Sequence, residues 1–128
     1  MYQPYQSIVT EVDDSVGIVT LNKEERHNAF DQQLIDELTH ALLSLDADPA
    51  ARVIVLSSAG KSFCAGADLN WMKRAITNTA QENLHDAHAF ARLMRTLNEL
   101  SKPTIARVHG PAFGGGVGLI AACDIALT

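Results

Sequence analysis

The fold is decided by the stretch His109-Gly110-Pro111-Ala112-Phe113-Gly114-Gly115-Gly116-Val117-Gly118, which holds five of the chain's eight glycines. An apolar run, 103–108, leads into it, and another, 119–122, follows it. We therefore predict a buried strand, a glycine loop and a buried helix. Glycine lets another group approach the bare backbone, and the start of a helix offers unpaired N–H groups. Such a place suits an anion or a developing oxyanion.

The glycines alone leave a second interpretation open. The stretch lacks the Lys-Ser/Thr pair of a phosphate-binding P-loop, and Leu119 stands where a G-x-G-x-x-G motif would have its third glycine. A tight turn that packs a helix hard against a sheet explains the glycines equally well.

Composition limits the classes of protein to consider. The 128 residues suit at most one domain, and 47% hydrophobic with 20% charged residues is ordinary for a globular protein. The formal net charge of −5 argues against nucleic acid as a partner, because such binding needs a concentrated basic surface. A small anionic ligand stays possible, since basic residues occur near predicted loops: Lys23, Arg26, Lys61, Lys73 and Arg74.

The cysteines and the apolar runs indicate the cellular compartment in which the protein is expected. Cys64 and Cys123 are the only cysteines and do not form a C-x-x-C motif, which favours a reducing environment without a disulfide framework. Residues 1–4 do not begin a signal-peptide pattern, and no apolar run approaches the roughly 20 residues that span a bilayer. We expect a cytoplasmic protein with no membrane partner.

Periodicity predicts alternating strands and helices. The first half shows a hairpin of strands 6–12 and 16–21, a polar loop 22–28, a helix capped by Asp31, and a strand 52–56. The second half shows a loop 57–67, a short turn 69–72 after Asp68, a helix from about 81 to 100, and strands 103–108 and 124–127. The buried stripe of the long helix is expected at Leu84, Ala87, Ala91, Met94 and Leu97, with Phe90 beside them.

This alternation predicts an α/β fold with a mainly parallel sheet. The last strand begins only at Asp124 and nothing in the sequence would cover it. We therefore expect residues 1–128 to be the N-terminal part of a single longer domain.

Two motifs together carry a resemblance. Ser62-Phe63-Cys64-Ala65-Gly66-Ala67-Asp68-Leu69 and the glycine stretch 109–118, followed by Ala122-Cys123-Asp124, resemble the enoyl-CoA hydratase/isomerase (crotonase) superfamily in order and separation. The loop ending Arg26-His27-Asn28-Ala29-Phe30 is similar to the family's first CoA-contacting loop. The resemblance covers nearly the whole chain and matches the N-terminal half of a typical member.

The resemblance implies a spiral of repeated ββα units, assembled as a homotrimer or a dimer of trimers. It implies an acyl-CoA thioester substrate, with CoA as part of the substrate and no separate cofactor or metal. By position, the backbone N–H groups of Ala67 and Gly115 would form the oxyanion hole for a thioester enolate. The residues implied to bind the substrate are Arg26, Asn28, Ala29, Ala65, Gly66, Asp68, Leu69, Pro111, Gly114 and Gly118. Asp68 is also expected to cap a helix, as its main role.

One position departs from the family pattern. A typical member has a glutamate where this chain has Gly118, and the second glutamate of the usual pair would follow Thr128. Asp124 reads instead as the start of the next strand. Hydration needs a proton moved at each end of the double bond, so the general acid or base is expected beyond Thr128. His85 and His88 are interpreted as ordinary helix residues rather than metal ligands.

The stretches 64–72 and 113–119, with glycine at position 118, resemble bacterial methylglutaconyl-CoA hydratases of leucine breakdown and the related isohexenylglutaconyl-CoA hydratases. A glutaconyl substrate has a free carboxylate, for which Arg92, Arg95 and Arg107 are candidate partners. Two alternatives stay open. One is an enoyl-CoA isomerase, which needs fewer acid–base groups. The other is a non-catalytic CoA-binding subunit.

Overall fold

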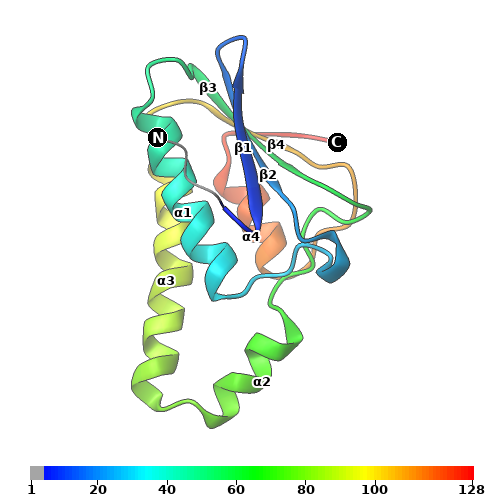
Figure 1. The fold of residues 1–128 in the computed structure, drawn as a ribbon, viewed down its shortest axis with the longest axis vertical. Coiled ribbons are helices and arrows are strands. Elements are labelled where there is room, and N and C mark those ends of the chain that lie inside the picture. Colours follow the sequence, from blue (N-terminus) through cyan, green and yellow to red (C-terminus); the bar gives the residue numbers. More distant parts are fainter. Residues whose placement is uncertain (1–4) are drawn as a thin grey trace.

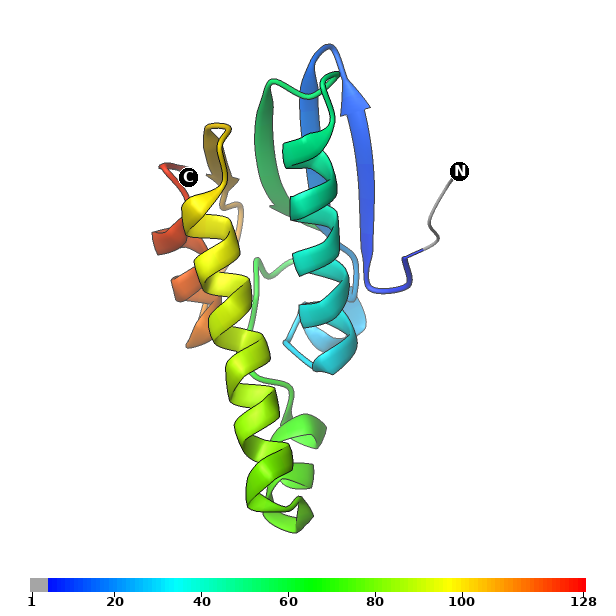
Figure 2. The same ribbon diagram turned by 90° about the vertical axis from the view of Figure 1, so that its left-hand side faces the viewer.

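The computed structural model describes residues 5–128, so the expectation about a signal peptide at residues 1–4 lies outside the described residues. One five-stranded sheet runs through the molecule in the order β1-β2-β3-β4-β5, and helices α1 and α3 lie side by side along it (Figures 1 and 2). Only β1 and β2 pair antiparallel, and the other three pairings are parallel. The predicted mainly parallel α/β architecture is confirmed.

The first unit is a β-hairpin covered by a helix. β1 (Ile8–Asp13) and β2 (Val16–Leu21) are joined by a turn at Asp14 and Ser15, which both have positive φ. Alternate residues of β2 are buried, as expected for a strand with one face on the core. A single 3₁₀ turn, η1 (Glu24–Arg26), lies in the polar loop that follows.

Helix α1 (Gln32–Ala47) begins at the predicted cap, because Asp31 Oδ1 accepts the N–H of Leu34 at 2.9 Å. Its apolar face packs on β1, β2 and β3 (Val53–Ser58). The buried side chains of α1 include all five that helical spacing predicted: Leu34, Ile35, Leu38, Leu42 and Leu45. This layer is the centre of the hydrophobic core.

Helices α2 (Leu69–Thr77) and α3 (Ala80–Glu99) form a hairpin whose tip extends beyond the sheet (Figure 1). The sequence indicated only a short turn at 69–72, so α2 is longer than predicted. The start of α3 carries a capping box, in which Thr79 and Glu82 exchange side-chain to backbone hydrogen bonds of 2.8 and 3.1 Å.

The predicted buried stripe of α3 is partly wrong. Leu84 is 55% exposed, and Ala87 and Ala91 are also exposed, whereas Leu93 and Leu97 are buried. The reason lies in the tertiary structure. The N-terminal half of α3 extends beyond the sheet, so few core residues face it (Figure 1). α3 packs on α1 and α4, and both of its buried side chains lie in its C-terminal half.

The chain then forms β4 (Thr104–Arg107), the glycine loop, α4 (Gly115–Ala122) and β5 (Ile125–Leu127). The predicted order of strand, glycine loop and helix is therefore confirmed. β4 lies between β3 and β5, so the glycine loop leaves the sheet beside its centre. Within residues 5–128, no helix combines the length and apolarity that a membrane crossing requires.

Candidate active site

Two single parallel bridges hold the motif loops together. Phe30 pairs with Ala67, and Cys64 pairs with Ala112. In the first bridge the Phe30 N–H donates to Gly66 O at 2.6 Å, and the Asp68 N–H donates to Phe30 O at 2.7 Å. Successive N–H groups of an extended chain point to opposite sides. The N–H of Ala67 therefore points away from Phe30.

The second predicted donor, Gly115, lies in the glycine triplet. Gly114 has φ 53° and ψ −123°, a conformation that glycine adopts at little cost, and it turns the chain into α4. Gly115 is the first residue of α4, so its N–H has no acceptor within the helix. A side chain at Gly116 would collide with the Cys64 carbonyl, which explains why this position is bare.

Ala67 and Gly115 line one cavity, here called the apolar cavity. Its volume is about 400 Å³ and its walls are Phe30, Ala67, Trp71, Met72, Ala75, Asn83, Asp86, Ala87, Phe90 and Gly115. Phe30 and Phe90 meet edge to face with ring centroids 5.1 Å apart. Preorganised backbone donors beside an apolar surface can stabilise an oxyanion.

The two polar residues of this wall, Asn83 and Asp86, differ in whether their side chains have hydrogen-bond partners. Asn83 is fully engaged, since its Nδ2 donates to Ala75 O at 2.9 Å and its Oδ1 accepts from Asn78 at 3.3 Å. Asp86, in contrast, has no hydrogen bond or ion pair to any residue in the described part of the chain. Sequence reasoning missed Phe30, Asn83 and Asp86 as wall residues. The helical spacing of Asn83, Asp86 and Phe90 was the available signal.

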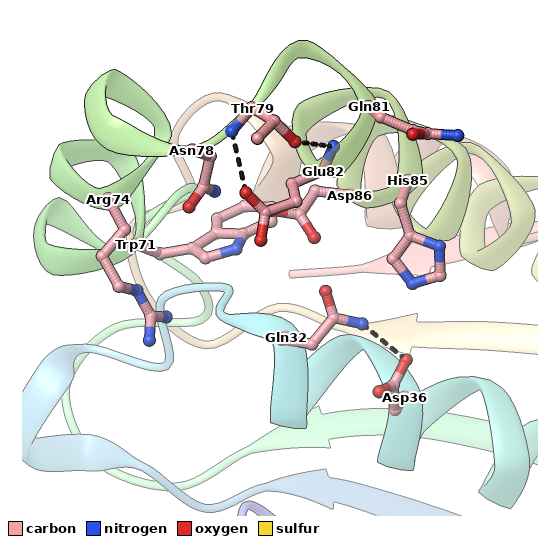
Figure 3. Close-up of a pocket in the computed structure, with 10 residues that line it drawn as sticks. All are labelled: Gln32, Asp36, Trp71, Arg74, Asn78, Thr79, Gln81, Glu82, His85 and Asp86. Atoms are coloured by element: carbon pink, nitrogen blue, oxygen red, sulfur yellow. Dashed lines mark hydrogen bonds between the residues drawn. The ribbon is translucent and has the colours of Figure 1, made fainter.

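A second cavity of about 580 Å³, here called the polar cavity, adjoins the first and shares Trp71 and Asp86 with it. It opens between the start of α1 and the α2–α3 hairpin. Figure 3 shows the Trp71 indole extending from α2 toward Glu82 and Asp86 of α3, with Gln32 and Asp36 of α1 opposite. The Oε1 atom of Gln32 is buried and has no hydrogen-bond partner.

A third cavity of about 500 Å³, here called the basic cavity, lies on the loop side of α2. It is lined by Lys23, Arg26, Asp31, Asp68, Asn70, Lys73 and Arg74. Arg26 Nη1 lies 3.1 Å from Asp68 Oδ1, while Asp68 Oδ2 accepts the Trp71 N–H at 3.1 Å. The predicted capping role of Asp68 is confirmed, and the ion pair was not expected. The excess of cations suits an anionic ligand.

The other predicted binding residues are placed as follows. Ala29 and Ala65 are half-buried, Leu69 is 68% exposed, and Gly66 is buried with φ 89°. Pro111 and Gly114 are exposed at the mouth of the glycine loop. Gly118 is half-buried against Met94 and is absent from the walls of the apolar cavity.

Asn28 differs from the prediction of direct contact. It is fully buried with φ 58°, and its Nδ2 donates to Ala59 O at 2.9 Å and to Ser62 O at 3.1 Å. Its Oδ1 accepts the Lys23 N–H at 2.8 Å. A side chain with no exposed surface cannot touch a ligand, so Asn28 can serve binding only by holding the two loops together.

The arginines proposed to meet a substrate carboxylate lie elsewhere. Arg92 lines a different cavity, Arg95 pairs with Glu99 at 3.3 Å, and Arg107 donates to Ser57 at 3.2 Å. None of the three lines the apolar or the polar cavity. In the described part of the chain, the one arginine on those walls is Arg74, in the polar cavity.

Three further residues have structural partners. Asp124 Oδ2 accepts the Thr104 N–H at 2.9 Å, which supports its interpretation as a strand-end residue. His109 Nε2 lies 2.6 Å from Gly60 O, so His109 has a hydrogen-bonded structural role. Residues 5–128 contain no group of three or more His, Cys, Asp or Glu arranged to hold a metal.

Burial disfavours the ionised thiolate form of both cysteines. It raises the pKa of Cys64 to about 11, although the Gly66 N–H acts in the opposite direction. Burial also raises the pKa of Cys123 to about 11, with the Thr104 hydrogen bond opposing and the Asp124 charge reinforcing the rise. Neither cysteine is therefore suited to act as a nucleophile near neutral pH.

Comparisons with known proteins agree with this geometry. A model of the family described as enoyl-CoA hydratase/isomerase matches residues 11–128. The chain is 39% identical over 112 residues to the mitochondrial enoyl-CoA hydratase of Pongo abelii, covering 88% of this chain and 37% of that protein. It is 35% identical over 133 residues to the peroxisomal Delta(3,5)-Delta(2,4)-dienoyl-CoA isomerase of Arabidopsis thaliana, covering 97% of this chain and 48% of that protein.

Solved structures show the same likeness. The crystal structure of an enoyl-CoA hydratase from Shewanella pealeana matches with a TM-score of 0.93 and 38% identity, over 95% of this chain and 46% of that one. The chain thus spans less than half the length of these relatives. The family match, the shared fold and the paired motif loops lead to one conclusion, that this chain belongs to the enoyl-CoA hydratase/isomerase family.

Proposed function

We propose that the protein containing this chain hydrates an enoyl-CoA thioester. The observation that carries the proposal is that Ala67 and Gly115, the two residues expected to supply backbone N–H donors, line one apolar cavity. When water adds to the double bond, negative charge develops on the thioester oxygen. Two fixed backbone donors beside that oxygen stabilise the charge more in the transition state than in the ground state. The name of the Pongo abelii relative supports the same reaction.

The basic cavity supports the binding of the CoA part. Lys23, Arg26 and Lys73 place positive charge beside the loop that ends at Ala67. Phosphate groups are attracted to such a cluster. CoA itself is part of the substrate, so the proposal includes no separate cofactor. It also includes assembly as a homotrimer or a dimer of trimers, and a cytoplasmic location that fits the two unpaired thiols.

For the acyl group we propose methylglutaconyl-CoA, an intermediate of leucine breakdown. The support is glycine at position 118, together with a cation near the apolar cavity. Arg74 lines the polar cavity, which adjoins the apolar cavity at Trp71 and Asp86. A distal carboxylate that passed Trp71 would approach Arg74. The longer isohexenylglutaconyl-CoA is the related alternative.

The decisive test uses two substitutions at Gly115 in the full-length protein. Gly115→Pro removes the N–H, whereas Gly115→Ala keeps it. Both variants add a Cβ at the same place, 2.8 Å from the rings of Phe30 and Phe90. Turnover is followed by the loss of the conjugated-thioester absorbance. We expect the proline variant to be about 10²–10³-fold slower than the alanine variant. Equal rates would remove Gly115 from the site, and no turnover by the unmodified protein would reject hydration.

A second candidate is double-bond isomerisation. The missing carboxylate at Gly118 and the likeness to the Arabidopsis thaliana isomerase favour it. Mass spectrometry of the product distinguishes the two reactions, because hydration adds the mass of water and isomerisation does not. Tight binding of the thioester with neither product would instead favour a non-catalytic CoA-binding subunit.

A further inference from the structure

Within residues 5–128, Asp86 is the one carboxylate on the wall of the apolar cavity. The other wall residues are apolar apart from Asn83, whose amide is already bonded at both ends. Asp86 is half-buried and no residue of the described chain pairs with it. An unpaired carboxylate on the wall of a mainly apolar cavity is a candidate functional group.

The position of Asp86 relative to the two donors can be traced along α3. Asp86 and Phe90 are four residues apart, so they share a helix face with about 6 Å of rise between them. The Phe90 ring in turn lies against Gly115, since its Cζ is 2.8 Å from where a Cβ at Gly115 would be. Asp86 is therefore one helical turn from the contact with an oxyanion donor, on the same cavity.

The remaining carboxylates near the motif loops are occupied. Asp68 caps α2 and pairs with Arg26, and Asp124 is bonded to Thr104. Asp31 caps α1. Gly118 has no side chain and does not line the cavity. Among residues 5–128, Asp86 is thus the carboxylate that is both free and placed on the cavity with Ala67 and Gly115.

We infer that Asp86 is a proton-transfer residue of the reaction in the apolar cavity, an inference that rests on the proposed function. Its carboxylate accepts a proton from water as the water oxygen bonds to Cβ of the enoyl group. The electron pair of the double bond moves toward the thioester, and the enolate oxygen is held by the two N–H groups. Asp86 then returns the proton to Cα. The product has gained one water, and the carboxylate is regenerated.

The experiment compares Asp86→Asn with Asp36→Asn in the full-length protein, using crotonyl-CoA as the probe. Asp36 lines the polar cavity but not the apolar cavity, so its variant removes an equal charge close by. We expect Asp86→Asn to lower kcat about 10²-fold or more, with KM changed less than threefold. Asp36→Asn should leave both constants within about twofold of the unmodified protein.

A second variant keeps the inference testable if the first is impaired for another reason. Asp86→Ala leaves room for a small carboxylate, so added formate should restore part of its turnover and should not change Asp36→Ala. An unchanged kcat in Asp86→Asn, or a rise in KM alone, would overturn the inference and leave the proposed function intact. If the unmodified protein consumes no enoyl-CoA, the proposed function and this inference fall together.

Discussion

The carboxylate of Asp68 is shared between Arg26 and the start of α2. Its Oδ1 lies 3.1 Å from Arg26 Nη1, and its Oδ2 accepts the Trp71 N–H at 3.1 Å. The carboxylate is nearly buried, whereas the arginine side chain is 45% exposed. This contact joins the loop before α1 to the loop that carries Ala67. It therefore fixes the positions of these two loops, which both line the basic cavity, relative to each other.

The loss of stability caused by a substitution at this contact should depend on which bond the substitution removes. Asp68→Ala loses the helix cap and should destabilise the protein by about 1–2 kcal/mol. Arg26→Gln loses only a solvent-screened ion pair and should cost less than about 1 kcal/mol. Asp68→Asn keeps a capping oxygen and should resemble Arg26→Gln. Urea unfolding of the full-length protein measures all three, and a larger loss in Arg26→Gln than in Asp68→Ala would contradict this ranking.

Two glycines of the sequence motifs should respond oppositely to alanine. Gly66 has φ 89°, and an added Cβ would be 2.9 Å from Phe113 O, so Gly66→Ala should cost about 1–3 kcal/mol. Gly118 is helical, and its Cβ would only meet Met94 Sδ at 3.4 Å. Gly118→Ala should therefore be neutral or stabilise by up to about 1 kcal/mol. Thermal unfolding measures both changes, and a strong loss at Gly118 would mean that this glycine is structurally required.

The thiols should react slowly in the folded protein. With a pKa of about 11 instead of 9.0, each has about 100-fold less thiolate at pH 8 than in the unfolded chain. Alkylation mapped by mass spectrometry should show slow labelling that urea accelerates, with half-buried Cys123 ahead of buried Cys64. Equal rates with and without urea would contradict the burial of both groups.

The same shifts predict a loss of stability in alkali. The folded state holds these two protons more tightly than the unfolded state, whose value is 9.0. The contribution to stability is therefore complete below pH 9 and is lost as the pH rises toward about 11. Urea midpoints measured from pH 8 to 11 should fall, and the fall should be shallower in a Cys64→Ala variant compared with its own value at pH 8.

The choice of acyl group can be tested at Arg74. If Arg74 meets the free carboxylate of methylglutaconyl-CoA, Arg74→Gln should raise KM for that thioester about 10-fold or more. KM for crotonyl-CoA, which lacks the carboxylate, should change little. Lys73→Gln is the matched control. Arg74 lines both the basic and the polar cavity, whereas Lys73 lines the basic cavity but not the polar one. Equal effects on both substrates would assign Arg74 to the CoA part.

Much of the fold could be predicted from local patterns. The apolar spacing of α1, the Asp31 cap and the glycine loop before α4 each reflect short-range physics that neighbouring residues determine. The α3 stripe could not be predicted in the same way. Leu84 is apolar at helical spacing and still exposed, because burial depends on whether the sheet extends far enough to cover it.

The sequence by itself determined the order of strands and helices and the two motif loops, because turn chemistry and hydrophobic spacing act over a few residues. Only the tertiary structure decided which residues share a cavity. Ala67, Asp86 and Gly115 come from three separate segments, and the Phe30–Ala67 bridge and the packing of α3 on α4 bring them together. Tertiary packing also explains why Asn28 is a buried residue that links two loops, and why Asp86 lines the apolar cavity. Contacts between distant segments depend on how whole elements pack, which no local pattern encodes.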